Sequence, residues 1–178
     1  QKPRLSYGVA VTDFDNDGLD EFIVTGFGYE NLALGFDGKN LKNKVKENIF
    51  SDFNRSTIGV AACDIDKDGH EEIYFLNTDT YSGQKMYSDR LLNIENKNIV
   101  DLFEKDINQS ELNLTAGRSV VCVDREGNGN YGVYVANYGG PTRFYEFIED
   151  RIVDLAESLN LDEITGGRAV VAGHILTD

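Results

Sequence analysis

Short apolar segments alternate along this chain with polar stretches rich in aspartate and glycine. The segment GVAVTD at residues 8–13 is matched 51 residues later by GVAACD at residues 59–64. Both run directly into the pattern Asp-x-Asp-x-Asp-Gly, and both are followed, after a glutamate, by a second apolar segment at residues 21–24 and 72–75. Apolar segments bounded by turn residues are typical of β-strands, so each pair is expected to form a strand, a loop and a strand.

The same arrangement recurs in the second half of the chain. A strand expected at residues 119–123 leads into a loop at residues 124–129, and a strand at residues 133–135 follows. The segment GRSV at residues 117–120 is echoed fifty residues later by GRAV at residues 167–170. We therefore expect a third unit and the unfinished beginning of a fourth.

Each unit also has a second half. Third strands are expected at residues 32–36, 91–94 and 144–148, and they meet polar turns at residues 37–38, 95–96 and 149–150. The first of these turns is Asp37-Gly38, which favours a hairpin because both turn positions adopt positive φ. Residues 99–103 and 152–156 then form either a fourth strand or a short helical turn.

About four strands in 50–60 residues are typical of one blade of a β-propeller. We therefore predict an all-β fold, a partial β-propeller whose blades span approximately residues 8–58, 59–116 and 117–166, with a further blade beginning at residues 167–178. An irregular β-sandwich with chance similarity among its loops is the alternative. Propellers have about 4–8 blades, and an incomplete one would leave a sheet edge unpaired and prone to aggregation. We therefore expect another chain or segment to supply the remaining blades.

The two aspartate loops have the composition of calcium sites. Ca²⁺ takes about 6–8 oxygen ligands, and carboxylates at alternate positions of a tight loop converge on one point. Mg²⁺ is less favoured because it prefers a few carboxylates and several waters. In each loop three aspartates, one backbone carbonyl and a closing glutamate are the predicted ligands: Asp13, Asp15, Asp17, Leu19 and Glu21 in the first, and Asp64, Asp66, Asp68, His70 and Glu72 in the second.

These loops are not EF-hands, although the opening is shared. An EF-hand requires a bidentate glutamate at position 12, and that position holds Val24 in the first loop and Phe75 in the second. The third loop is degenerate: Asp124, Glu126 and Asn128 occupy the alternate positions, and Gly132 stands where the glutamate should close the site. Fewer carboxylates predict a weaker third site.

The Asp-x-Asp-x-Asp-Gly-x-x-Glu loops between strands resemble the FG-GAP repeat of integrin α-subunit propellers. A closer resemblance is to the cartilage acidic protein family of secreted, integrin-α-like propellers. That resemblance implies the N-terminal part of a seven-bladed type of propeller that is extracellular, acidic and glycosylated, and it covers nearly the whole chain. It rests on the segments at residues 7–13, 62–66, 71–77, 116–120 and 165–168.

Charge and composition limit the classes of function that this chain could have. The chain has 178 residues, 31 of them acidic and 17 basic, for a net charge of −14. Such a surface repels nucleic acid, and no apolar run reaches the ~20 residues that span a membrane. The chain begins with Gln1 and shows no secretory signal, which suggests a mature or trimmed product. No catalytic motif is present, and the two histidines, His70 and His174, are far apart.

Cys63 and Cys122, the only cysteines, each lie just before an aspartate loop, one and two residues ahead of it. Side chains alternate between the faces of a strand, so the two thiols point to opposite faces of adjacent blades. In an oxidising compartment we expect them to form a disulfide, the alternative being two buried thiols. Three glycosylation sequons fall in predicted connections between blades, where a glycan has room, at Asn54, Asn108 and Asn113.

The function predicted from these features is a non-catalytic, calcium-binding extracellular propeller module that interacts with an extracellular, matrix or cell-surface protein. A lectin is the second hypothesis, because Tyr29, Tyr81 and Tyr138 follow strands at loop positions where aromatic rings can stack on sugars. An enzyme whose chemistry lies in sequence outside this chain is the third.

Overall fold

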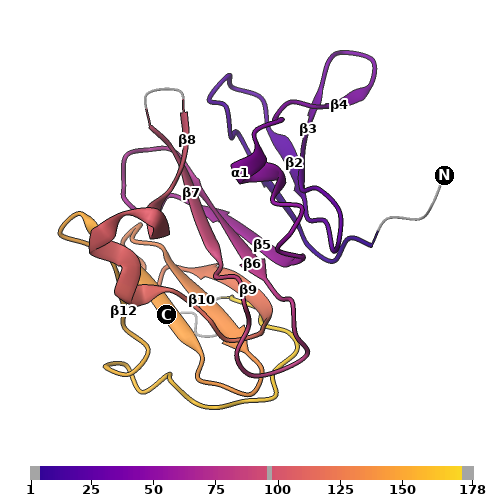
Figure 1. Cartoon of the computed structure of the whole chain (residues 1–178). Helices are drawn as coiled ribbons and strands as arrows, with labels where there is room; N and C mark the ends of the chain where they lie inside the picture. Colours follow the sequence, from indigo (N-terminus) through magenta and orange to yellow (C-terminus); the bar gives the residue numbers. More distant parts are fainter. Residues whose placement is uncertain (1–4, 96–97, 174–178) are drawn as a thin grey trace.

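Twelve strands form three antiparallel sheets of four strands each in the computed structural model, which describes residues 5–95 and 98–173 (Figure 1). Neighbouring strands in each sheet are consecutive in the chain. The first sheet contains β1 (Val9–Thr12), β2 (Glu21–Val24), β3 (Leu32–Phe36) and β4 (Leu41–Asn43). The second contains β5 (Thr57–Cys63), β6 (Glu72–Asn77), β7 (Arg90–Glu95) and β8 (Asn98–Asp101). The third contains β9 (Gly117–Val123), β10 (Gly132–Asn137), β11 (Arg143–Ile148) and β12 (Arg151–Asp154).

Short helices lie in the connections between the sheets. The α-helix α1 (Asn48–Ser51) precedes the second sheet, and the 3₁₀ helices η1 (Leu102–Glu104) and η2 (Asp106–Glu111) precede the third. The sequence predicted either a strand or a helical turn at residues 99–103, and the structure has both, because β8 ends where η1 begins. No helix in the described part of the chain is long and apolar enough to cross a membrane.

Two hydrophobic cores hold the three sheets together. One joins the first and second sheets around Ile23, Phe50 and Phe75, and the other joins the second and third sheets around Tyr74 and Tyr145. The first strands of the sheets adjoin, since β5 contacts β1 on one side and β9 on the other. Three four-stranded sheets packed face to face confirm the predicted all-β architecture and have the form of propeller blades.

Strand β6 contributes to both cores. Successive side chains of a strand point to opposite faces, and Ile73 and Phe75 enter the first core while Tyr74 and Leu76 enter the second. Every residue of β6 is therefore buried, which explains why residues 73–76 are a continuous apolar run rather than an alternating pattern.

The predicted turns are only partly as expected. Glu149 and Asp150, with φ of 49° and 61°, form the two-residue turn between β11 and β12 that the sequence predicts. At Asp37-Gly38 the hairpin is confirmed, but the expectation of two positive φ angles is wrong. Gly38 alone has positive φ, because the loop is four residues long and the Asp37 side chain accepts hydrogen bonds from the N–H groups of Lys39 and Asn40. The third turn, at residues 95–96, lies partly outside the described residues.

The fourth unit is not formed as a sheet in the described residues. Residues 167–173 contain no strand, and residues 174–178, including His174, lie outside the described part of the chain. A blade beginning at residue 167 therefore stays a prediction.

A disulfide joins Cys63 of β5 to Cys122 of β9, as the sequence predicts. The Cα atoms lie 6.3 Å apart, across the interface between the second and third sheets. It therefore links the first strands of two adjacent sheets covalently, directly before their aspartate loops.

Candidate metal centre

The first aspartate loop connects β1 to β2 and folds around Asp13. Its carboxylate accepts hydrogen bonds from the backbone N–H groups of Asp17 at 3.0 Å and Gly18 at 2.9 Å. Gly18 has a φ of 87°, a conformation that glycine adopts without strain. One carboxylate oxygen from each of Asp13, Asp15 and Asp17 lies within 4.8 Å of the others, as the sequence pattern requires for a shared cation.

The second loop, between β5 and β6, repeats this arrangement with one difference. The Asp64 carboxylate accepts the N–H of Gly69 at 3.0 Å, and Gly69 has a φ of 90°. Here the converging carboxylates are those of Asp64, Asp66 and Glu72, again within 4.8 Å of one another. In the second loop the closing glutamate, Glu72, therefore lies beside Asp64 and Asp66.

The closing glutamates Glu21 and Glu72 are buried in the same way. In each, Oε2 accepts a backbone N–H from the residue after the first aspartate, Phe14 at 3.2 Å and Ile65 at 2.9 Å. The other oxygen, Oε1, is buried without a hydrogen-bond partner in the described structure, and so is Oδ1 of Asp64. A buried carboxylate oxygen without a donor costs free energy, and a bound cation would remove that cost.

Electrostatics also favour a positive ion here. Burial, assisted by Asp66, Asp68 and Asp64, raises the pKa of Glu72 to about 8, although the Ile65 N–H opposes the shift. Burial likewise raises the pKa of Glu21, and Asp15 adds to the effect. The loops therefore concentrate negative charge that the protein itself neutralises poorly.

The remaining predicted ligands hold the loops in shape. Leu19 and His70 donate their N–H groups to Asp17 at 2.9 Å and Asp68 at 2.8 Å, and the residues are exposed. Asp68 is also exposed and does not belong to the converging group of the second loop. The carbonyl ligands predicted at residues 19 and 70 stay predictions.

Two residues near the loops were missed by sequence reasoning. The Lys44 ammonium, just after β4, lies 3.8 Å from the Asp17 carboxylate, and the Asn93 amide of β7 donates to Asp66 at 3.3 Å. Both come from segments that are far from their loop in sequence, so no local motif signals them. Lys44 partly offsets the charge of the first loop, whereas Asn93 orients a carboxylate in the second.

The third loop, between β9 and β10, is held by hydrogen bonds and an arginine. The Asp124 carboxylate accepts N–H groups from Gly129 at 2.8 Å and Asn128 at 3.2 Å, which lower its pKa. The Arg125 guanidinium pairs with Glu126 at 2.6 Å and also with Glu146 at 2.6 Å. Arg125 occupies the position that the buried side chains of Phe14 and Ile65 fill in the other loops.

No carboxylate closes the third loop, and none fits there. A side chain at Gly132 would place its Cβ 2.7 Å from the Phe144 ring. Among the described residues, converging groups of three acidic side chains lie in the first two loops, whereas the third loop offers two carboxylates, Asp124 and Glu126, and the Asn128 amide. The donor set of the first two loops therefore fits a divalent ion, and a weaker site in the third loop stays a prediction.

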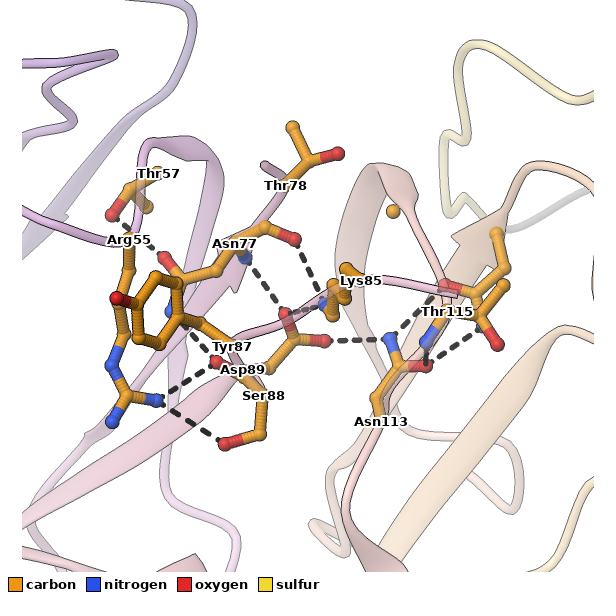
Figure 2. A network of polar contacts seen from close by, with 12 residues as sticks. Arg55, Thr57, Asn77, Thr78, Lys85, Tyr87, Ser88, Asp89, Asn113 and Thr115 are labelled. Atoms are coloured by element: carbon orange, nitrogen blue, oxygen red, sulfur yellow. Dashed lines mark hydrogen bonds and ion pairs between the residues drawn. The ribbon is translucent and has the colours of Figure 1, made fainter. Parts of the chain in front are cut away.

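Two of the three predicted glycosylation positions are enclosed by the fold. Asn108 and Asn113 are fully buried. The Asn108 amide donates to the Leu102 carbonyl at 2.7 Å and accepts the N–H of Ile152 at 2.9 Å. Asn113 donates to the Asp89 carboxylate at 2.6 Å inside the polar network of Figure 2. Neither nitrogen has room for a glycan in this fold, whereas Asn54 is exposed.

Comparison with known proteins agrees with the fold and the loops. A family model described as FG-GAP-like repeat matches residues 6–75. Cartilage acidic protein 1 of Xenopus tropicalis is 40% identical over 197 aligned positions, which cover 97% of this chain and 30% of that protein. The Homo sapiens protein is 40% identical over 98% of the chain, and the Mus musculus protein 39% over 98%.

The chain spans about 30% of the length of the curated relatives it matches. The similarity nevertheless extends across all three sheets and both complete aspartate loops, because it covers nearly every residue of the chain. The chain is therefore a homologue of cartilage acidic protein 1 that carries an FG-GAP-like repeat, as the resemblance in its sequence predicts.

Proposed function

We propose that this chain is a calcium-binding, non-catalytic part of an extracellular β-propeller whose surface mediates interaction with matrix or cell-surface proteins. The observation that carries the metal assignment is the matched burial of Glu21 and Glu72, each with one oxygen lacking a donor. Calcium fits better than magnesium because each of the two loops offers four carboxylates, whereas magnesium prefers one or two carboxylates and several waters.

In the first two loops the ligands would be the aspartates, the carbonyl of residue 19 or 70, and the closing glutamate. Each ion would join the end of one strand to the start of the next. In this role calcium would act as a structural element of each blade. In the third loop the Arg125 guanidinium takes the place of the cation, because it pairs with Glu126 and Glu146.

The proposed blades are those predicted from the sequence, at approximately residues 8–58, 59–116 and 117–166. Further blades from elsewhere in the protein would cover the outer face of the first sheet. Phe22 and Val9 are 45% and 62% exposed there, whereas the matching residues of the second sheet, Ile73 and Val60, are 0% and 9% exposed. Ile73 and Val60 each pack on the preceding sheet. The exposed apolar face of the first sheet therefore has the kind of side chains that pack between two blades.

An extracellular location is supported by the disulfide, which persists in oxidising compartments. The exposed sequon at Asn54 is consistent with secretion, and we propose it as the glycosylated position. The carbohydrate-binding alternative is weaker. Tyr81 and Tyr138 do pack together, with ring centroids 5.4 Å apart, but the Arg118 guanidinium lies over both rings, where a sugar would stack.

Calorimetric titration of calcium into EGTA-treated protein tests the proposal. We expect two binding events and a melting temperature that rises when calcium is restored, because a ligand that binds only the folded state stabilises it. Absence of calcium uptake, together with melting unchanged by EGTA, would overturn the metal assignment.

A further inference from the structure

One residue from each unit lines a single hollow at the start of the first strands. Tyr7, Ile58 and Arg118 each stand six positions before the first loop aspartate of their unit, and Arg168 is the counterpart of Arg118 in the repeated Gly-Arg segment. All four line a hollow of about 580 Å³, together with Tyr81. The aspartate loops follow the other end of the same strands, so the hollow and the metal loops lie at opposite ends of β1 and β5.

Two arginines converge in this hollow around one tyrosine. The Arg118 guanidinium lies 5.0 Å from the centre of the Tyr81 ring and 5.5 Å from that of Tyr138, and it also donates to the Tyr81 carbonyl. Arg168 donates to the Tyr81 hydroxyl at 3.0 Å. Tyr81 thus positions both guanidinium groups at the same opening.

Neither arginine has a carboxylate partner in the part of the chain that the structure describes. By contrast, Arg55, Arg90, Arg125 and Arg143 each form at least one ion pair. Arg151 on β12 also forms no ion pair in the described structure, but Arg118 and Arg168 are two guanidinium groups that share one hollow without a neutralising carboxylate, in a chain of net charge −14.

The acidic residue that lines the hollow already accepts other hydrogen bonds. Asp79 lines the hollow, but its carboxylate accepts the backbone N–H groups of Met86 at 2.9 Å and Tyr87 at 3.2 Å. It stabilises its own loop and forms no ion pair with Arg118 or Arg168. The positive charge of the hollow is therefore available to a ligand.

We propose that Arg118 and Arg168 bind a carboxylate side chain presented by a protein partner. A guanidinium offers parallel N–H donors that match the two oxygens of a carboxylate, and the flanking aromatic ring fixes its orientation. A single acidic side chain suits the site better than a sulfated glycan, because the surrounding chain carries 31 acidic residues and repels a polyanion. The inference rests on the proposed interaction role and is independent of the calcium sites.

The test is an NMR titration of the intact protein, in calcium-containing buffer and with ¹⁵N-labelled arginine, using a short peptide, acetylated and amidated at its ends, whose only carboxylate is a single Asp. We expect saturable shifts of the Arg118 and Arg168 Nε–H signals, and at least a tenfold loss of affinity in the Arg118→Gln, Arg168→Gln double variant. A peptide with Asn in place of Asp should leave the signals unchanged. Arg151→Gln is the matched control, because Arg151 is exposed on β12 and does not line the hollow.

The proposal would be overturned by the absence of a saturable shift with the Asp peptide, by equal shifts with the Asn peptide, or by shifts with a heparin oligosaccharide alone. A shift seen in the 178-residue chain and absent from the intact protein would also overturn it, by showing that the protein's own blades cover the arginines. Calcium calorimetry on the same samples separates these failures from failure of the metal assignment.

Discussion

The Lys85 ammonium and the Asp89 carboxylate form an ion pair that is fully buried beside the second sheet (Figure 2). Asp89 also accepts hydrogen bonds from the Tyr74 hydroxyl and the backbone N–H of Asn77, both at 2.7 Å, and from the Asn113 amide. Burial lowers the pKa of Lys85, and the attraction of Asp89 opposes that shift. The pair is therefore stable only while both partners and the surrounding donors remain in place.

Removal of the Lys85 charge should be strongly destabilising. We expect Lys85→Met to lower the free energy of unfolding by about 3–5 kcal/mol, because it leaves the Asp89 charge buried without its cation. Urea unfolding followed by circular dichroism measures the change. The matched control is Lys105→Met, which breaks an exposed pair with Glu95 and should cost less than about 1 kcal/mol. Equal effects of the two variants would contradict the assignment of a structural role to the buried pair.

Neutralising Glu72 should remove one calcium site. We expect Glu72→Gln to reduce the calorimetric stoichiometry from two to one, or to weaken that site at least about tenfold, because fewer charged ligands bind calcium less tightly. Glu71→Gln is the control, since Glu71 is the adjacent exposed residue and is not a predicted ligand. Two undiminished binding events in Glu72→Gln would show that this carboxylate is not a ligand.

Substitution in the third loop should leave calcium binding unchanged. We expect Asp124→Asn to retain both binding events, because Arg125 already neutralises Glu126 and no carboxylate closes this loop. The equivalent substitution in the second loop, Asp64→Asn, should remove one event. Calorimetry of the two variants side by side decides the question, and loss of an event in Asp124→Asn would show a third occupied site.

Removing the disulfide should destabilise the contact between the second and third sheets. The Cys63→Ala, Cys122→Ala double variant opens a loop closed over a sequence separation of 59 residues. On chain entropy alone this corresponds to about 4 kcal/mol. Thermal unfolding of the variant, compared with the parent protein with and without reductant, measures the loss. If the disulfide is the cause, reductant should lower the stability of the parent and leave the variant unaffected.

Glycosylation should be confined to one of the three sequons. In protein secreted from a eukaryotic host we expect a glycan at Asn54, which is exposed, and none at Asn108 or Asn113, whose amides are buried and hydrogen-bonded. Peptide mapping after deglycosylation in ¹⁸O-labelled water identifies the modified asparagines. A glycan at Asn113 in folded protein would contradict the polar network around Asp89.

Features that repeat locally could be predicted from the sequence. The loops of Asp13 and Asp64 are each contained in nine residues, and glycine at the sixth position permits the turn, so their shape depends little on the rest of the fold. The cysteine pairing followed from the positions of Cys63 and Cys122 just before the second and third loops. In these cases spacing along the chain determines spacing in the structure.

Features that depend on contacts between sheets could not be predicted. Asn113 reads as a surface sequon, yet packing of the second and third sheets buries it against Asp89 and Asn137. Arg125 reads as an ordinary loop residue, and only the pairing of β10 with β11 brings Glu146 within its reach. The register that creates these contacts is a property of the whole fold and leaves no local pattern.

The double-sided burial of β6 has a consequence for how this strand is aligned. A one-residue slip normally exposes apolar side chains and buries polar ones, which penalises the wrong pairing. In β6 such a slip would only exchange Tyr74 and Phe75 between two apolar cores. The burial of apolar side chains alone therefore cannot determine the register of this strand. The register must instead be determined by the polar residues at the two ends of β6. Glu72 accepts a backbone N–H of the aspartate loop, and the Asn77 amide donates to the Ser88 carbonyl and accepts the Thr57 hydroxyl.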